Sequence, residues 1–319
     1  MALRQPPLPL TRKRPAVATG FDQRSTVRPT QRREPASLLR QLGRWDLVRL
    51  VRSGPLASVY QARAAGSVAG QRAAYAVKVA ASADDAADLA TQAICREALV
   101  AGEVKHPHLV TVLAAHVARA PAYIVMPWLE GTTLAELSRR QRIDAPSALW
   151  YVRQAAEALE ALHAAGWMHA DVKPENLLVS RSGHVTLLDL GFARRPHDPA
   201  SEIDRSVVGT IHYLAPEMAS PSWRPDIRSD FYSLGVTLYE LLAGKRPFEG
   251  PGLTEMIAQH REERPRELRR LNPHLPRELA ALVHELMSKN PLRRPQTPSE
   301  LIERLIELEV MTFGERGIG

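Results

Sequence analysis

The chain has 319 residues, 45% of them hydrophobic, which is long enough for a two-lobed globular domain with a short extension. Its formal net charge of +7 comes from the first forty residues, so the basic character does not indicate a nucleic-acid-binding domain. The one cysteine excludes an intrachain disulfide, and no apolar run reaches the ~18 residues that a membrane span needs.

Residues 1–43 are expected to be a disordered basic tail, because they are rich in Pro, Arg, Gln and Thr and show no apolar periodicity. The tail lacks the apolar core of a secretory signal, so with the lone cysteine we expect a cytoplasmic protein. It is either a solubilising segment or one that docks acidic partners. Its hydroxyl residues Thr11, Ser25, Thr26 and Thr30 lie near Arg or Lys in the sequence. The near absence of aromatic residues argues against nucleic-acid binding.

From residue 45 onward the patterns predict strands first and helices afterwards. Expected strands cover residues 47–51, 58–62, 74–79, 110–117 and 122–126, with short ones on either side of Gly183. Expected helices cover residues 82–104, 146–165, 227–242, 253–261, 277–288 and 298–308. This order predicts an α+β domain over 44–310, with an antiparallel N-lobe (44–128), a mainly helical C-lobe (129–310) and a short tail (311–319).

Two motifs in the second half carry the chemistry. Residues 169–176 read HADVKPEN, and residues 189–191 read DLG. Carboxylate and amide oxygens are ligands that magnesium prefers, and a carboxylate can also orient a hydroxyl; Asp171, Asn176 and Asp189 supply these types. Either segment alone is equally well explained as a turn, but the further motifs in order favour the catalytic interpretation.

The two motifs resemble the catalytic loop and metal-binding triplet of the eukaryotic-like (Hanks-type) Ser/Thr protein kinases. Ala170 stands where that family has Arg, and Leu190 where it has Phe. The resemblance implies that Asp171 is the catalytic base and that Lys173 approaches the γ-phosphate of ATP. It also implies that Asn176 and Asp189 bind Mg²⁺ or Mn²⁺.

A second set of residues matches the family in the N-lobe. Lys78 follows Ala76-Val77, as in the V-A-I-K strand, and would hold the α- and β-phosphates of ATP. Glu97, nineteen residues later, is placed to pair with Lys78, although an exposed helical charge is the plain alternative. Cys95 is interpreted as a packing thiol that points elsewhere around the helix.

The nucleotide loop is the weakest match, because residues 52–59 keep only Gly54 of the three glycines in the family pattern. Glycine lets the backbone approach phosphates, so Arg52 and Ala57 predict weaker or slower nucleotide handling, and glycine restored at both positions should lower the KM for ATP. By resemblance, the residues around the nucleotide are Arg52, Gly54, Val59, Ala76, Leu178 and the hinge residues Met126 and Trp128.

The substrate side matches well, since residues 209–217 read GTIHYLAPE. The resemblance implies that Thr210 bonds to the catalytic residues. It assigns structural roles to Glu217, which would pair with Arg294, and to Asp230, which would accept bonds from the catalytic-loop backbone.

Control of the segment after Asp189 is expected to differ from the family. There, Arg before the catalytic Asp helps to bind a phosphorylated residue that orders this segment. Ala170 removes that cation, and Arg194 could supply only part of it. We therefore expect activity that does not require phosphorylation of Ser201 or Ser206.

The leading interpretation is an ATP-dependent Ser/Thr protein kinase that acts on protein substrates, with a cognate phosphatase as a possible partner. It is also expected to phosphorylate itself, with Thr11, Ser25, Thr26 and Thr30 of the tail as candidate acceptors. The Ala- and Arg-rich composition indicates a bacterial source. A pseudokinase or scaffold is the first alternative, motivated by the loop at 52–59. A small-molecule kinase on the same fold is the second, disfavoured by Lys173 and the 209–217 segment.

Overall fold

The computed structural model describes residues 40–68, 70–82, 87–196, 210–219, 224–250 and 252–314, and these belong to one compact unit. Most of the expected tail and the expected helix start near residue 84 lie outside these ranges.

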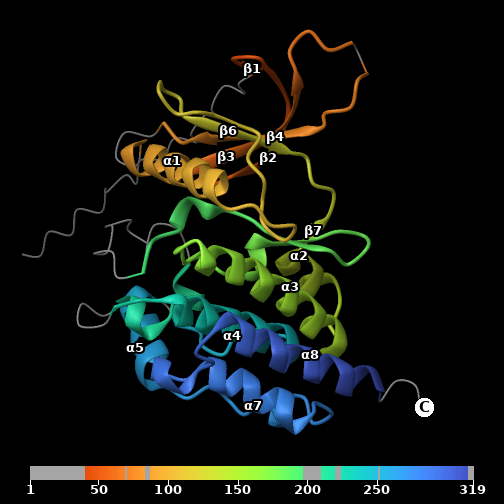
Figure 1. Cartoon of the computed structure of the whole chain (residues 1–319), viewed down its shortest axis with the longest axis vertical. Helices are drawn as coiled ribbons and strands as arrows, with labels where there is room; N and C mark the ends of the chain where they lie inside the picture. Colours follow the sequence, from red (N-terminus) through yellow and green to blue (C-terminus); the bar gives the residue numbers. More distant parts are fainter. Residues whose placement is uncertain are drawn as a thin grey trace, which may run out of the picture. The chain divides into compact units, whose positions relative to one another are not determined.

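The N-lobe is a six-stranded antiparallel sheet with one helix beside it (Figure 1). Its strands, in spatial order, are β1 (Gln41–Leu42), β2 (Trp45–Ser53), β3 (Ala57–Ala64), β4 (Tyr75–Ala80), β6 (Tyr123–Pro127) and β5 (Ala114–His116). Period-2 alternation divides β6: Tyr123 and Val125 pack in a small core on one face, while Ile124 and Met126 pack in the main core on the other.

The helix α1 (Ala87–Glu103) buries one stripe of residues, Ala90, Ala93, Ile94, Glu97, Val100 and Ala101. The spacing of three and four residues puts these side chains on a single helical face. Because that face contacts β4 and the DLG turn, the carboxylate of Glu97 is carried into the interior between the lobes.

The C-lobe is mainly helical, as Figure 1 shows in green to blue. Its helices are α2 (Leu134–Arg140), α3 (Ala145–Ala164), α4 (Ile227–Ala243), α5 (Leu253–Glu262), α6 (Leu268–Leu271), α7 (Arg277–Leu286) and α8 (Pro298–Gly314). Short 3₁₀ helices are η1 (Pro174–Asn176), η2 (Leu190–Phe192), η4 (Thr210–Tyr213), η5 (Pro216–Ala219) and η6 (Pro291–Arg293). A three-stranded sheet, β7 (Thr132–Thr133), β8 (Leu177–Val179) and β9 (Val185–Leu187), lies next to the cleft.

Local sequence explains the bounds of α3, the central helix of this lobe. Asp144 caps its first turn by accepting a bond from the Ser147 N–H, and Pro146 occupies a position in the first turn, where no N–H is needed. The helix ends before Gly166, whose φ of +76° is the left-handed conformation that glycine adopts readily.

The two-lobed α+β prediction is confirmed, but several elements differ from those expected; helix α2, for example, was not among the expected helices. Strand β1 lies inside the segment expected to be tail, where it pairs with β2. Helix α6 was missed because four residues are too short to show a period. Helix α8 continues to Gly314, past the expected domain end at 310, because the Thr312 side chain is buried and its hydroxyl donates to the Leu308 carbonyl at 2.9 Å.

Within the described ranges, no helix is both long enough and apolar enough to cross a bilayer.

Candidate active site

The two lobes enclose a cavity of about 300 Å³. It is lined by residues of the β2–β3 hairpin, β4, α1, the β6–β7 connection, the catalytic loop and the DLG turn. This size suits a small organic ligand, and the lining is mainly apolar with a smaller charged part.

Lys78 connects the two lobes at the charged end of the cavity. Its Nζ lies 2.6 Å from Glu97 Oε2 and 2.8 Å from Asp189 Oδ1. Burial acts to lower the pKa of Lys78, but the carboxylates of Asp189 and Glu97 outweigh it and hold that pKa above its usual value. Burial also raises the pKa of Glu97, so ionisation of this carboxyl depends on the ammonium beside it. The expected Lys78–Glu97 pair is therefore present, and it places a protonated amine in the cavity.

Asp189 is held in a left-handed backbone conformation, with φ of +67°, at the start of η2. Burial opposes its ionisation, but the attraction of Lys78 is stronger and lowers its pKa. A Cβ on Gly191 would lie 3.2 Å from Asp189 Oδ1 and 3.3 Å from the Ala93 side chain, which explains why glycine follows two residues later. Leu190, in place of the family's Phe, is fully buried in the main core.

The catalytic loop places two polar side chains, those of Lys173 and Asn176, around Asp171. Lys173 Nζ lies 2.8 Å from Asp171 Oδ2. Asn176 Nδ2 donates to the same oxygen and to the Asp171 carbonyl, both at 2.9 Å. Asp171 is only 2% exposed, so these donors compensate its burial and fix the orientation of its carboxylate.

His169 is a structural residue that the sequence did not single out. Its Nε2 bonds to the Leu188 carbonyl at 3.0 Å, and its Nδ1 accepts the Asp171 N–H at 3.2 Å, which assigns the neutral Nε2–H tautomer. Burial lowers the pKa of this imidazole, in keeping with the neutral form. The ring connects the catalytic loop to Leu188, directly before Asp189. The position of His169 at the start of the HADVKPEN motif could have indicated this structural role.

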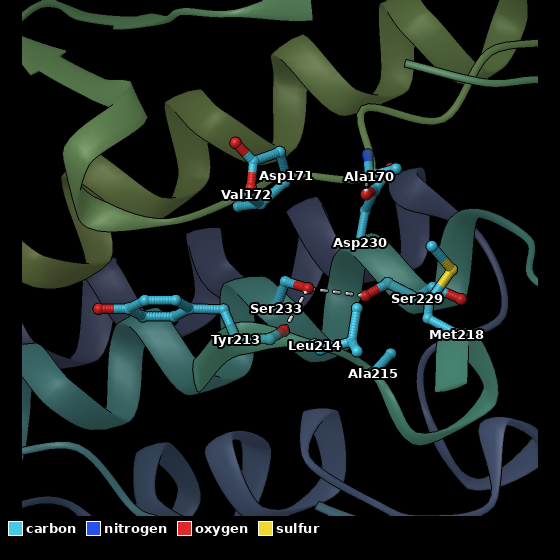
Figure 2. Close-up of a pocket in the computed structure, with 10 residues that line it drawn as sticks. All are labelled: Ala170, Asp171, Val172, Tyr213, Leu214, Ala215, Met218, Ser229, Asp230 and Ser233. Atoms are coloured by element: carbon cyan, nitrogen blue, oxygen red, sulfur yellow. Dashed lines mark hydrogen bonds between the residues drawn. The ribbon is translucent and has the colours of Figure 1, made fainter. Parts of the chain in front are cut away.

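Asp230 holds the loop from below. Its carboxylate accepts the His169 N–H at 2.8 Å and the Ala170 N–H at 2.7 Å, as expected. Ala170 itself has a φ of +61°, an unfavourable region for a residue with a Cβ. Figure 2 shows Ala170 and Asp171 on one side of a small cavity, with Asp230 beneath Ala170 and Tyr213 on the opposite wall. The carboxylate thus stabilises a strained turn next to the proposed base.

The expected Glu217–Arg294 pair is also present and is buried. Arg294 Nη1 and Nη2 lie 2.6 and 2.9 Å from the two carboxylate oxygens, a bidentate arrangement. The guanidinium also donates to the Ser288 and Arg228 carbonyls, at 2.9 and 2.8 Å. This network joins η5 to α4 and to the end of η6, and neither Glu217 nor Arg294 lines the cavity.

The segment between the DLG motif and residues 209–217, here called the activation segment, is described only at its two ends. Arg194 is buried at 8% exposure, and its backbone exchanges bonds with that of Met168 at 2.8 and 3.0 Å. Ser201 and Ser206 lie outside the described residues, and of Thr210 only the backbone, at the start of η4, is described.

The residues expected around the nucleotide all line the cavity, including Lys173, Gly54 and Trp128. Further lining residues, which the sequence did not indicate, are Val51, Ala90, Ala93, Ile94, Val110, Thr133, Glu175, Leu188 and Phe192. Three of these, Ala90, Ala93 and Ile94, share a helical face with Glu97, so spacing from Glu97 could have found them.

The oxygen donors of the cavity suit a divalent metal that arrives with a nucleotide. Asn176 and Asp189 line the same cavity, and the Asp189 side chain is 31% exposed, so its carboxylate is accessible. In the described ranges, no three His, Cys, Asp or Glu side chains gather into a metal cage. Amide and carboxylate oxygens are ligands that Mg²⁺ accepts, and substrate phosphates usually complete its coordination.

Comparison with known proteins gives consistent matches over the same region. The family model of the protein kinase domain matches residues 45–305. The serine/threonine-protein kinase PknB of Mycobacterium tuberculosis is 36% identical over 220 residues, covering 67% of this chain and 35% of that protein. The probable serine/threonine-protein kinase PknB of Lactococcus lactis is 30% identical over 248 residues, covering 77% and 39%. The serine/threonine-protein kinase pkn2 of Myxococcus xanthus is 37% identical over 218 residues, covering 66% and 26%. The chain thus spans well under half the length of these relatives.

Proposed function

The chain belongs to the protein kinase domain family, and we therefore propose that it transfers the γ-phosphoryl group of ATP to Ser or Thr hydroxyls of proteins. One observation carries the proposal. Lys78 contacts both Glu97 and Asp189 in a cavity whose lining also includes Asp171 and Asn176. The glycine-poor loop is the only described motif that favours a pseudokinase, and it leaves this charged centre intact.

The contacts of each residue support a specific role. Lys78, kept protonated by two carboxylates, would bind the α- and β-phosphates. Asn176 and Asp189 would hold Mg²⁺ or Mn²⁺, which supplies charge neutralisation on the phosphates when bound. Asp171 would orient the substrate hydroxyl and accept its proton, and Lys173 beside it would stabilise charge on the transferred group.

The wider role is part of the same proposal. Sequence relatives described as Ser/Thr-protein kinases of bacteria support a bacterial Ser/Thr kinase. A signalling role and action in the cytoplasm belong to the same proposal. Autophosphorylation, and reversal by a cognate phosphatase, would follow from such a role. The residues before β1 would act as an accessory tail to the catalytic domain.

The test is transfer of label from γ-labelled ATP with Mg²⁺ to a generic protein substrate. The wild-type chain should label Ser or Thr, and Lys78→Met should reduce the rate by two orders of magnitude or more, because phosphate positioning is lost. Lys245→Met removes an exposed lysine and should keep the wild-type rate. A wild-type chain that binds ATP yet transfers no more label than Lys78→Met would show a pseudokinase.

A further inference from the structure

Arg52 stands on the sheet face that covers the nucleotide cavity. Arg52 on β2 pairs with Val59 on β3, and Val59 pairs with Lys78 on β4. Directly opposed residues of antiparallel strands project to the same face of the sheet. Arg52 therefore shares a face with Val59 and Lys78, and all three line the same cavity.

The charges that line the cavity single out Arg52 among its cations. The lining holds three cations, Arg52, Lys78 and Lys173, and four anions, Glu97, Asp171, Glu175 and Asp189. Lys78 is paired with two of the carboxylates and Lys173 with a third. Arg52 forms no ion pair with any residue in the described ranges, so its guanidinium remains available for an incoming anion.

Hydrogen bonds hold the loop between β2 and β3, which begins close to Arg52, in one conformation. The hydroxyls of Ser53 and Ser58 lie 3.0 Å apart across the hairpin, and the Gly54 N–H donates to the Ala57 carbonyl at 2.9 Å. At the tip, the Leu56 carbonyl accepts the Ala81 N–H at 2.9 Å, and the Leu56 side chain is buried in the main core. A loop held in this way has limited freedom to bring its backbone N–H groups onto phosphates.

We infer that Arg52 contacts the phosphates of the bound nucleotide and replaces the backbone contacts that a glycine-rich loop would make. The inference rests on the proposed function, which makes the cavity a nucleotide site. A guanidinium presents two parallel N–H donors to a phosphate, and it stays charged at all physiological pH values. The loop then binds phosphate through one side chain, and its stiffness helps to place that side chain.

This assignment reverses one expectation drawn from the sequence. If glycine at position 52 improved backbone approach, Arg52→Gly would lower the KM for ATP. If the guanidinium is the phosphate ligand, Arg52→Gly raises it. The sign of the change therefore separates the two accounts.

The experiment is calorimetric binding of ADP and of adenosine to the full chain. Adenosine has the base and ribose but no phosphate, so the ratio of the two affinities isolates the phosphate contact. Arg52→Ala should weaken ADP binding about tenfold, since one charge-assisted contact is lost, and should change adenosine binding less than about twofold. Arg44→Ala removes an exposed arginine of the same lobe that does not line the cavity, and it should change neither affinity.

Each outcome decides between the accounts. Equal weakening of ADP and adenosine would move Arg52 to the base or ribose and overturn the phosphate assignment. Unchanged ADP binding in Arg52→Ala, or tighter ADP binding in Arg52→Gly, would overturn it as well. A wild-type chain that binds neither ligand would instead overturn the nucleotide site and the proposed function with it. Arg52→Lys should retain part of the affinity for ADP, because it keeps the charge without the two-donor geometry.

Discussion

Asp230 offers the sharpest link between stability and function in this chain. Its carboxylate accepts two buried backbone N–H groups, those of His169 and Ala170, at 2.8 and 2.7 Å. Asp230→Ala removes the acceptor and leaves both donors unsatisfied in the interior. Asp230→Asn keeps one oxygen that accepts a bond, but it replaces the other oxygen by an NH₂ group, which cannot accept the second backbone N–H.

The magnitude follows from the two bonds. Hydrogen bonds to a charged group contribute about 1.5–3 kcal/mol each, so Asp230→Ala should lower the free energy of unfolding by about 3–6 kcal/mol. Asp230→Asn should lose roughly half of that. This is a large share of the ~5–15 kcal/mol that stabilises a typical domain. Asp171 directly follows Ala170, one of the two residues that Asp230 holds. The rate of phosphoryl transfer should therefore fall in both variants, and the KM for ATP should change less.

Urea unfolding and steady-state kinetics on the same samples test this. Asp226→Ala is the matched control: Asp226 lies four residues earlier and caps α4 by accepting the Arg228 N–H at 2.9 Å. Loss of that cap should cost only ~1 kcal/mol and leave the rate unchanged. The reasoning is refuted if Asp230→Ala unfolds within 1 kcal/mol of the wild type, or if folded Asp230→Asn transfers phosphate at the wild-type rate.

Three further predictions concern stability and regulation. Burial lowers the pKa of His260 from 6.5 to about 3, so between these pH values the unfolded chain binds a proton that the folded chain does not. The free energy of unfolding should therefore be unaffected by His260 above pH 6.5 and should fall by about 1.4 kcal/mol per pH unit as the pH decreases toward 3. In His260→Gln, the melting temperature should depend less on pH between pH 7 and 5 than in the wild type. Glu217→Gln should lower the free energy of urea unfolding by about 3–5 kcal/mol because Arg294 stays buried without a counter-charge, whereas Glu285→Gln, in a more exposed pair, should cost under ~1 kcal/mol. Unphosphorylated Ser201→Ala/Ser206→Ala protein should keep most of its rate; a drop of tenfold or more that acidic residues restore would show that phosphorylation controls the enzyme despite Ala170.

The sequence predicts those parts of this structure in which chemistry and spacing coincide. The pair of Lys78 and Glu97 was predicted because Lys78 lies in a strand motif and Glu97 follows nineteen residues later in an expected helix. The cleft between two lobes was predicted from the order of strands and helices. The other buried side chains of α1 were not predicted, although their spacing from Glu97 would have indicated them.

Other features depend on tertiary contacts that no local pattern contains. Strand β1 is two residues long and is defined only by its pairing with β2. Two register shifts in β2 set the faces of Arg49 and Leu50 opposite to those that strict alternation predicts. The availability of Arg52 likewise becomes visible only when the partners of Lys78 and Lys173 are known.

The most direct test of the account is single-turnover phosphoryl transfer by Asp171→Asn, measured alongside its affinity for ATP. This change keeps the shape of the side chain and removes its ability to accept a proton. The account predicts transfer about 10²–10⁴-fold slower than in the wild type, with ATP binding changed by less than about threefold, because Lys78 and Asp189 remain in place. Transfer at the wild-type rate by folded Asp171→Asn protein would contradict the assignment of this site.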